Sequence, residues 1–207
     1  MKKVILSAIA IMLFVFVNAQ EVRYGIKGGV NLSSWVGDTK GMNLKPIIGV
    51  NLGVLAQIKL TDELDIQPEV LYSTQGTKMK NVGADLSGRY YTGDIKTNVS
   101  YINIPVLFKY SLDGKSFFEA GPQVGFLMSA KTATKLSQYS QTVNQDAKEF
   151  FEPVDFNFVV GVGFNITQHL MTDLRYNIGL SNIAKTESGD DTKIHNSVLA
   201  LSLAYKF

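Results

Sequence analysis

Residues 153–166 read PVDFNFVVGVGFNI, and this stretch decides the fold because two kinds of side chain alternate along it. Bulky apolar side chains occupy every second position from Val154 to Ile166, while most positions between them carry Asp155, asparagine or glycine. Successive side chains of a β-strand point to opposite faces. The pattern therefore predicts a strand with one apolar face and one polar face.

The same alternation recurs along the chain in segments of about ten residues. We expect eight strands, near 22–32, 46–60, 64–76, 98–111, 116–128, 153–166, 169–182 and 195–207. The connections 61–63, 113–115 and 167–168 are tight, whereas 33–45, 77–97, 129–152 and 183–194 are long and polar. Short turns at one end and long loops at the other are typical of bacterial outer-membrane barrels, whose short turns face the periplasm.

The first residues have the features of an export signal. Lys2 and Lys3 precede an apolar run from Val4 to Val17, and Ala19 provides a small residue for cleavage. We expect residues 1–19 to be a cleaved signal peptide and residues 20–207 to be the barrel domain. The run is too short for a membrane-spanning helix, which needs about 20 apolar residues.

Composition excludes several kinds of protein. The chain has no cysteine, so it has no disulfides, thiolate metal sites or lipoprotein anchor. Loss of Lys2 and Lys3 lowers the basic count from 20 to 18, which equals the 18 acidic residues. A neutral mature chain gives no reason to expect a nucleic-acid partner.

The positions of glycine and of aromatic residues indicate which medium each face meets. Glycines fall on the polar face of the strands, where they relieve crowding in a narrow lumen; these are Gly25, Gly29, Gly49, Gly53, Gly121, Gly125, Gly161, Gly163 and Gly179. Aromatic residues lie near strand ends on the apolar face, as in the girdles of membrane barrels; these are Tyr72, Phe108, Tyr110, Tyr205 and Phe207. We expect an all-β, eight-stranded antiparallel transmembrane up-and-down barrel. The alternative is a soluble barrel with the apolar face inside.

Three segments resemble the PorT-like outer-membrane β-barrel family, one of the porin-family-like outer-membrane β-barrel domains. They are YGIKGGVN at 24–31, LDIQPEVLYS at 64–73, and YINIPVLFKY at 101–110 followed by GPQVG at 121–125. The resemblance implies an eight-stranded barrel in a gram-negative cell envelope. One type of member is linked to protein secretion, but the shared residues mark strands and turns and carry no working site.

Charged residues on the polar face are candidates for a functional site inside the barrel. Side chains fill the interior of an eight-stranded barrel, so we expect an interlocked charge network of Lys27, Lys59, Glu69, Lys109, Glu119, Asp173 and Arg175. The alternative is a narrow polar path that makes the protein a small-solute channel. Pro68, Pro105 and Pro122 lie inside predicted strands, where we expect them to shape β-bulges.

The C-terminal residues Leu203, Tyr205 and Phe207 share one face and are similar to the signal that the barrel-assembly machinery recognises. His195 and Ser197 are loosely similar to the catalytic pair of lipid A deacylases, with Glu187 as the third member.

The remaining predictions concern activity and partners. No nucleophile elbow, phosphate-binding loop or paired metal motif occurs, so we expect no enzyme, cofactor or metal. The expected partners are outer-membrane lipid, the assembly machinery, and an envelope or secretion protein that meets the long loops. A structural or interaction role is the leading hypothesis, ahead of the channel and the lipid A-modifying enzyme.

Overall fold

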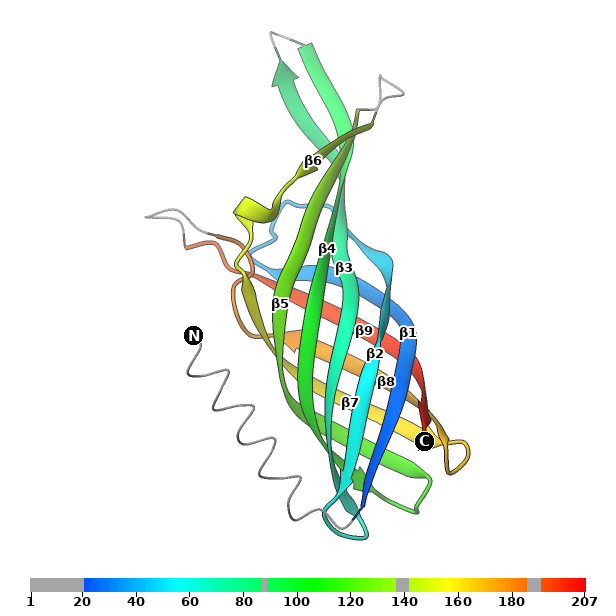
Figure 1. The fold of residues 1–207 in the computed structure, drawn as a ribbon. Coiled ribbons are helices and arrows are strands. Elements are labelled where there is room, and N and C mark those ends of the chain that lie inside the picture. Colours follow the sequence, from blue (N-terminus) through cyan, green and yellow to red (C-terminus); the bar gives the residue numbers. More distant parts are fainter. Residues whose placement is uncertain (1–20, 87–88, 137–141, 186–190) are drawn as a thin grey trace.

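The computed structural model describes residues 21–86, 89–136, 142–185 and 191–207 (Figure 1). The predicted signal peptide, residues 1–19, lies outside the described residues. Within the described part of the chain, no helix has the length and apolar character needed to cross a membrane.

Eight antiparallel strands form a closed ring (Figure 1). Each strand pairs with its neighbour in the ring order β4-β3-β2-β1-β9-β8-β7-β5, and pairing of β4 with β5 closes the ring. This confirms the predicted eight-stranded up-and-down barrel. The strands are β1 (Val22–Gly37), β2 (Leu44–Lys59), β3 (Leu64–Leu86), β4 (Arg89–Ser111), β5 (Ser116–Leu136), β7 (Val154–Asn165), β8 (Leu170–Gly179) and β9 (Ile194–Lys206).

Three short turns lie at the end of the barrel where β1 begins and β9 ends. One side chain in each turn accepts a backbone N–H: Thr61 from Leu64 at 3.0 Å, Asp113 from Ser116 at 2.5 Å, and Thr167 from Leu170. The N–H groups of Ser116 and Lys115 also lower the pKa of Asp113 below its usual value. Short turns mark the periplasmic end of an outer-membrane barrel.

The opposite, external end differs from the expected long loops. Residues 77–97 fall mostly in β3 and β4, which continue outward as a paired hairpin. Residues 129–152 contain the outer part of β5, the short strand β6 (Thr142–Asp146) and the 3-10 helix η1 (Lys148–Phe150). A sheet therefore projects beyond the ring on one side (Figure 1).

The bulges predicted at Pro68, Pro105 and Pro122 do not occur. Pro68 pairs opposite Val106, and Pro105 pairs opposite Gln123, in continuous register. The missing N–H of each proline removes a donor without adding a residue. The bulges lie instead between Pro46 and Asn51, between Met79 and Val82, and between Ser100 and Tyr101.

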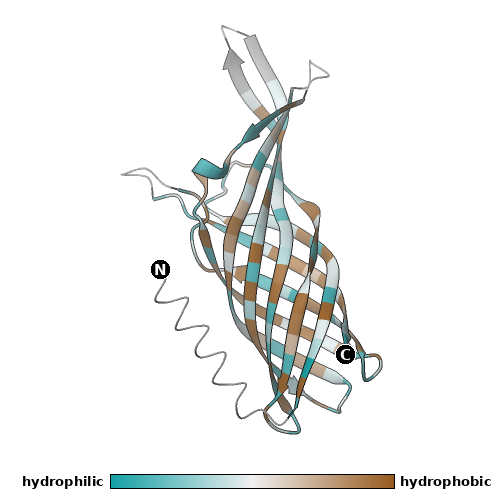
Figure 2. Cartoon of the chain, viewed as in Figure 1, coloured by the Kyte–Doolittle hydropathy of each residue, from teal (hydrophilic) through white to brown (hydrophobic). Residues whose placement is uncertain are grey.

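The barrel has its apolar side chains outside and its polar side chains inside. Leu201 on β9 is 52% exposed, whereas Lys27 and Glu69 are each 2% exposed. Figure 2 shows hydrophobic and hydrophilic positions alternating along the strands of the ring. A soluble protein buries apolar side chains and exposes charges. The reversed arrangement is that of a barrel whose outer face meets lipid.

Candidate functional site

Arg175 on β8 is the centre of a charge network inside the lumen. Its Nη1 and Nη2 atoms donate to the two carboxylate oxygens of Glu69 on β3 at 2.7 and 2.8 Å. Its Nε and Nη2 atoms donate to Glu119 on β5 at 2.5 and 3.1 Å. Planar guanidinium groups suit such paired contacts. One arginine therefore joins strands on opposite parts of the ring.

Lys27 and Asp173 complete this network. The Nζ of Lys27 on β1 donates to Asp173 on β8 at 2.5 Å and lies 3.7 Å from Glu69. Asp173 also lies 3.2 Å from the Nε of Arg175. Two cations thus face three carboxylates that are almost completely buried.

Lys109 on β4 supplies the third cation. Its Nζ donates to Gln67 at 3.0 Å, and Gln67 in turn donates to Glu69 at 2.5 Å. The same Nζ lies 3.7 Å from the centre of the Phe117 ring, which attracts a cation. Three buried cations therefore balance three buried carboxylates.

The structure places Lys59 outside this network. Its side chain lies at the periplasmic rim, is 44% exposed and pairs with Asp62 at 2.9 Å. Lys59 is the last residue of β2, so its aliphatic chain reaches the turn that follows and not the lumen. The six other predicted network residues are brought together.

Apolar side chains fill the lumen on the periplasmic side of the network. Leu55, Phe117, Met171 and Ala204 form a buried cluster there. Phe117 occupies the place where a side chain at Gly163 would lie, so glycine at that position makes room for the ring. This cluster separates the buried charges from the periplasmic opening.

Amide and hydroxyl side chains fill the lumen on the external side of the network. Asn51 donates to Asn31 at 2.7 Å, and Asn31 donates to Ser73 at 3.0 Å. A cavity of about 20 Å³ remains between this layer and Arg175. A space of that size holds one water molecule and no solute.

A second apolar cluster covers the external end of the lumen. Half-buried Trp35 and Ile194 pack against it, and the Trp35 and Phe151 rings lie 5.6 Å apart. Sequence reasoning missed this cover because its residues come from strand ends and from predicted loops. The buried members are Val99, Tyr101, Leu127, Ala130, Ala147, Phe151 and Ile183.

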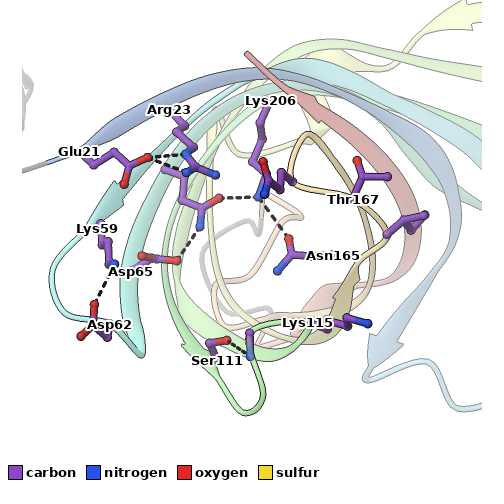
Figure 3. Close-up of a pocket in the computed structure, with 14 residues that line it drawn as sticks. Glu21, Arg23, Lys59, Asp62, Asp65, Ser111, Lys115, Asn165, Thr167 and Lys206 are labelled. Carbon is purple, nitrogen blue, oxygen red and sulfur yellow. Dashed lines mark hydrogen bonds and ion pairs between the residues drawn. The ribbon is translucent and has the colours of Figure 1, made fainter.

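The periplasmic mouth is an open vestibule of about 500 Å³ (Figure 3). Charged side chains of both signs surround it, and most are paired with each other. Arg23 pairs with Glu21 at 2.6 Å, and Lys206 donates to Asn165 at 3.2 Å. In the strand register, the buried cluster that contains Phe117 and Met171 lies between the residues that line the vestibule and the charge network, so the vestibule does not continue as a pore.

The three C-terminal residues that resemble an assembly signal lie on the lipid face. Leu203, Tyr205 and Phe207 are all exposed. The Tyr205 ring stacks on His169 at 5.9 Å and meets the Phe207 ring edge-on at 5.6 Å. Aromatic side chains at this depth form part of the girdle at the periplasmic interface.

His195 and Ser197 have other partners. The Nδ1 of His195 is hydrogen-bonded to the carbonyl of Ser181 at 2.8 Å, and the hydroxyl of Ser197 to that of Tyr176 at 2.7 Å. Glu187, the third predicted member, lies outside the described residues. The geometry gives the lipid A-modifying hypothesis no support. In the described ranges, no three His, Asp or Glu side chains form a metal-binding group.

The family model described as "Outer membrane protein beta-barrel domain" matches residues 18–185. The chain belongs to this family. Membership and the lipid-facing barrel place the protein in the bacterial outer membrane. No curated protein matches this family member in a sequence search.

Solved structures similar to this family member are also outer-membrane barrels. The attachment invasion locus protein Ail of Yersinia pestis has 16% identity and a TM-score of 0.50, with 91% of this chain and 100% of Ail covered. Neisserial surface protein A has 11% identity and a TM-score of 0.50, with the same coverage. At these identities the similarity concerns the fold alone.

Proposed function

We propose that the protein is a non-enzymatic, non-conducting barrel that presents its external sheet to another protein of the cell envelope. The sealed lumen carries this proposal: two apolar clusters and a balanced charge network fill the interior. In the described part of the chain, the outer parts of β3, β4 and β5 together with β6 extend beyond the ring, and we call them the external sheet. β3 and β4 each have 23 residues and β5 has 21, whereas β8 has 10.

The short strand β6 offers an edge for a partner. It pairs with β5 from Lys131 to Lys135, and its five residues are exposed. In the described part of the sheet, β6 is the terminal strand. A strand edge presents free N–H and C=O groups that can pair with an extended segment of another protein.

Because the chain lacks cysteine, one introduced thiol tests this edge in living cells. We expect Val143→Cys, in β6, to form a discrete cross-linked product with a short thiol-to-amine reagent. Met42→Cys, in the exposed connection between β1 and β2, is the matched control and is expected to give none. Failure of Val143→Cys to cross-link, or equal products from both variants, would contradict the docking edge.

Because the lumen is sealed, the protein is predicted not to conduct ions across a planar lipid bilayer. We expect no discrete conductance steps after insertion, because Phe117 and Met171 on one side and Tyr101 on the other close the lumen. Stepwise conductance whose ion selectivity changes in Glu119→Gln would support the small-solute channel instead. A heat-shifted band on an unboiled gel shows that the protein added to the bilayer was folded.

The PorT-like resemblance supports protein secretion as the process in which the external sheet acts. Deletion of the gene in its native host is expected to lower the amount of secreted protein in the medium, as measured by mass spectrometry. Complementation with a chain in which a two-residue Asn-Gly turn replaces residues 80–94 should not restore secretion. An unchanged set of secreted proteins would remove this part of the proposal.

We also propose that residues 1–19 are cleaved and that the C-terminal face binds the barrel-assembly machinery. Phe207→Ala is expected to lower the folded fraction in the outer membrane severalfold while refolding in detergent stays unchanged. The physical reason is that Phe207 lies on the lipid face at the strand end and is 69% exposed, so its side chain contributes little to packing. Equal folded fractions for Phe207→Ala and wild type in cells would count against the signal.

A further inference from the structure

Three lysines lie side by side on the external part of the barrel wall. Lys45 on β2 pairs opposite Lys78 on β3, and Lys78 pairs opposite Lys96 on β4. Side chains directly opposite each other on neighbouring strands have Cβ atoms about 5 Å apart, and like charges there are destabilising. A row of three lysines therefore favours a bound counter-anion.

Two lysines of β5 extend this row across a fourth strand. Lys131 pairs opposite Asn98, two residues from Lys96, and Lys135 pairs opposite Asp94. Strand neighbours two residues apart share a face. We call the five residues Lys45, Lys78, Lys96, Lys131 and Lys135 the lysine face.

Few carboxylates neutralise the lysine face. Asp94 pairs with Lys78 at 2.8 Å, and in the described part of the chain this is the only ion pair that a member of the lysine face makes. Asp146 is opposite Lys131 in the strand register but accepts the backbone N–H of Lys148 at 2.8 Å. Five cations and two carboxylates leave three positive charges in excess.

The lysine face continues directly from the lipid-facing surface. Below it on the same strands lie the exposed side chains of Tyr72 and Met128, and Ile102 pairs opposite Tyr72. The Tyr72 hydroxyl donates to Ser100 at 3.0 Å. Lys131 is three residues beyond Met128, and Lys78 is six residues beyond Tyr72. For a rise of about 3.3 Å per residue and a tilt of about 40°, these lysines stand about 8 to 15 Å above the apolar band.

We propose that the lysine face binds the phosphate groups of the glycolipid in the outer leaflet. Its height matches the headgroup layer and not the hydrocarbon, and its excess positive charge complements phosphate. Lysine carries a compact charge on a flexible chain, which suits phosphates whose positions vary. Lys131 and Lys135 pair with β6, but the lysine face uses side chains on one face of the sheet, whereas the β6 proposal uses the free backbone edge of β6. Loss of lipid binding and loss of cross-linking can therefore occur independently.

Binding of purified lipid A to the immobilised, detergent-solubilised barrel tests this proposal. The test variant combines Lys45→Gln, Lys96→Gln and Lys131→Gln. The matched control combines Lys40→Gln, Lys185→Gln and Lys193→Gln, which makes the same charge change at the same end of the barrel. Retained lipid is measured by mass spectrometry, and a heat-shifted band shows that each variant is folded.

We expect the test variant to retain about tenfold less lipid A than wild type, and the control variant to retain the same amount as wild type. Dephosphorylated lipid A should bind wild type as weakly as lipid A binds the test variant, and added salt should reduce the difference. Equal retention of both lipids would overturn the proposal. So would equal loss in both variants, displacement by millimolar inorganic phosphate, or a sulfated polysaccharide that binds where lipid A does not.

Discussion

Arg175→Met is expected to lower the free energy of unfolding by about 3–5 kcal/mol, the usual cost of breaking a buried ion pair. The arginine makes four hydrogen bonds to Glu69 and Glu119. Without it, Lys27 and Lys109 face three buried carboxylates. Methionine keeps most of the side-chain volume, so the effect measures lost charge pairing.

Equilibrium unfolding in urea with detergent measures this change. Trp35 is the only tryptophan and packs against the external apolar cluster, so its fluorescence reports on the folded barrel. The matched control is Arg23→Met, which breaks the exposed pair with Glu21 and should cost at most about 1 kcal/mol. Adding Glu69→Gln and Glu119→Gln to Arg175→Met should recover part of the loss. Equal effects of the two arginine substitutions would show that the network does not stabilise the barrel.

The strands and the lumen network could be predicted because both depend on a period of two. Asp155, Asp173 and Arg175 alternate with bulky apolar residues on strands whose register is continuous. With a continuous register, every second residue along the sequence points to the same face of the sheet, and this places these three side chains inside the lumen. This alternation could not predict the position of the Lys59 side chain, because Lys59 ends its strand and its flexible chain turns towards Asp62.

The external half was harder to predict for a different reason. Each bulge inserts one extra residue into a strand. Beyond the bulge, the odd- and even-numbered residues of that strand exchange faces. The irregularity at Ser100 and Tyr101 puts Lys131 on the outer face, although Glu119 and Gln123, which are also odd-numbered, point inward. The lysine face and the external apolar cluster therefore appear only when the strand pairing is known.

Leu201→Arg is expected to destabilise the barrel by about 2–4 kcal/mol, because it places a charge near the middle of the lipid face. Leu201 lies opposite Val30 on β1 and Leu174 on β8, all with exposed apolar side chains. Leu112→Arg is the matched control. Leu112 is in a periplasmic turn and is similarly exposed, so the cost there should be about 0–1 kcal/mol.

The dependence of the destabilisation on the depth of the substituted residue distinguishes lipid from water as the medium around the barrel. Both leucines are exposed, so in water both substitutions would have similarly small effects. In lipid, the free-energy penalty for an introduced charge depends on its distance from the membrane interface. Only Leu201→Arg should therefore strongly shift the urea midpoint when the barrel folds into lipid vesicles. Equal midpoints for the two variants would contradict a lipid-facing outer surface. They would also contradict the idea that apolar residues stabilise this barrel by contacting lipid, while charged residues stabilise it by pairing inside the lumen.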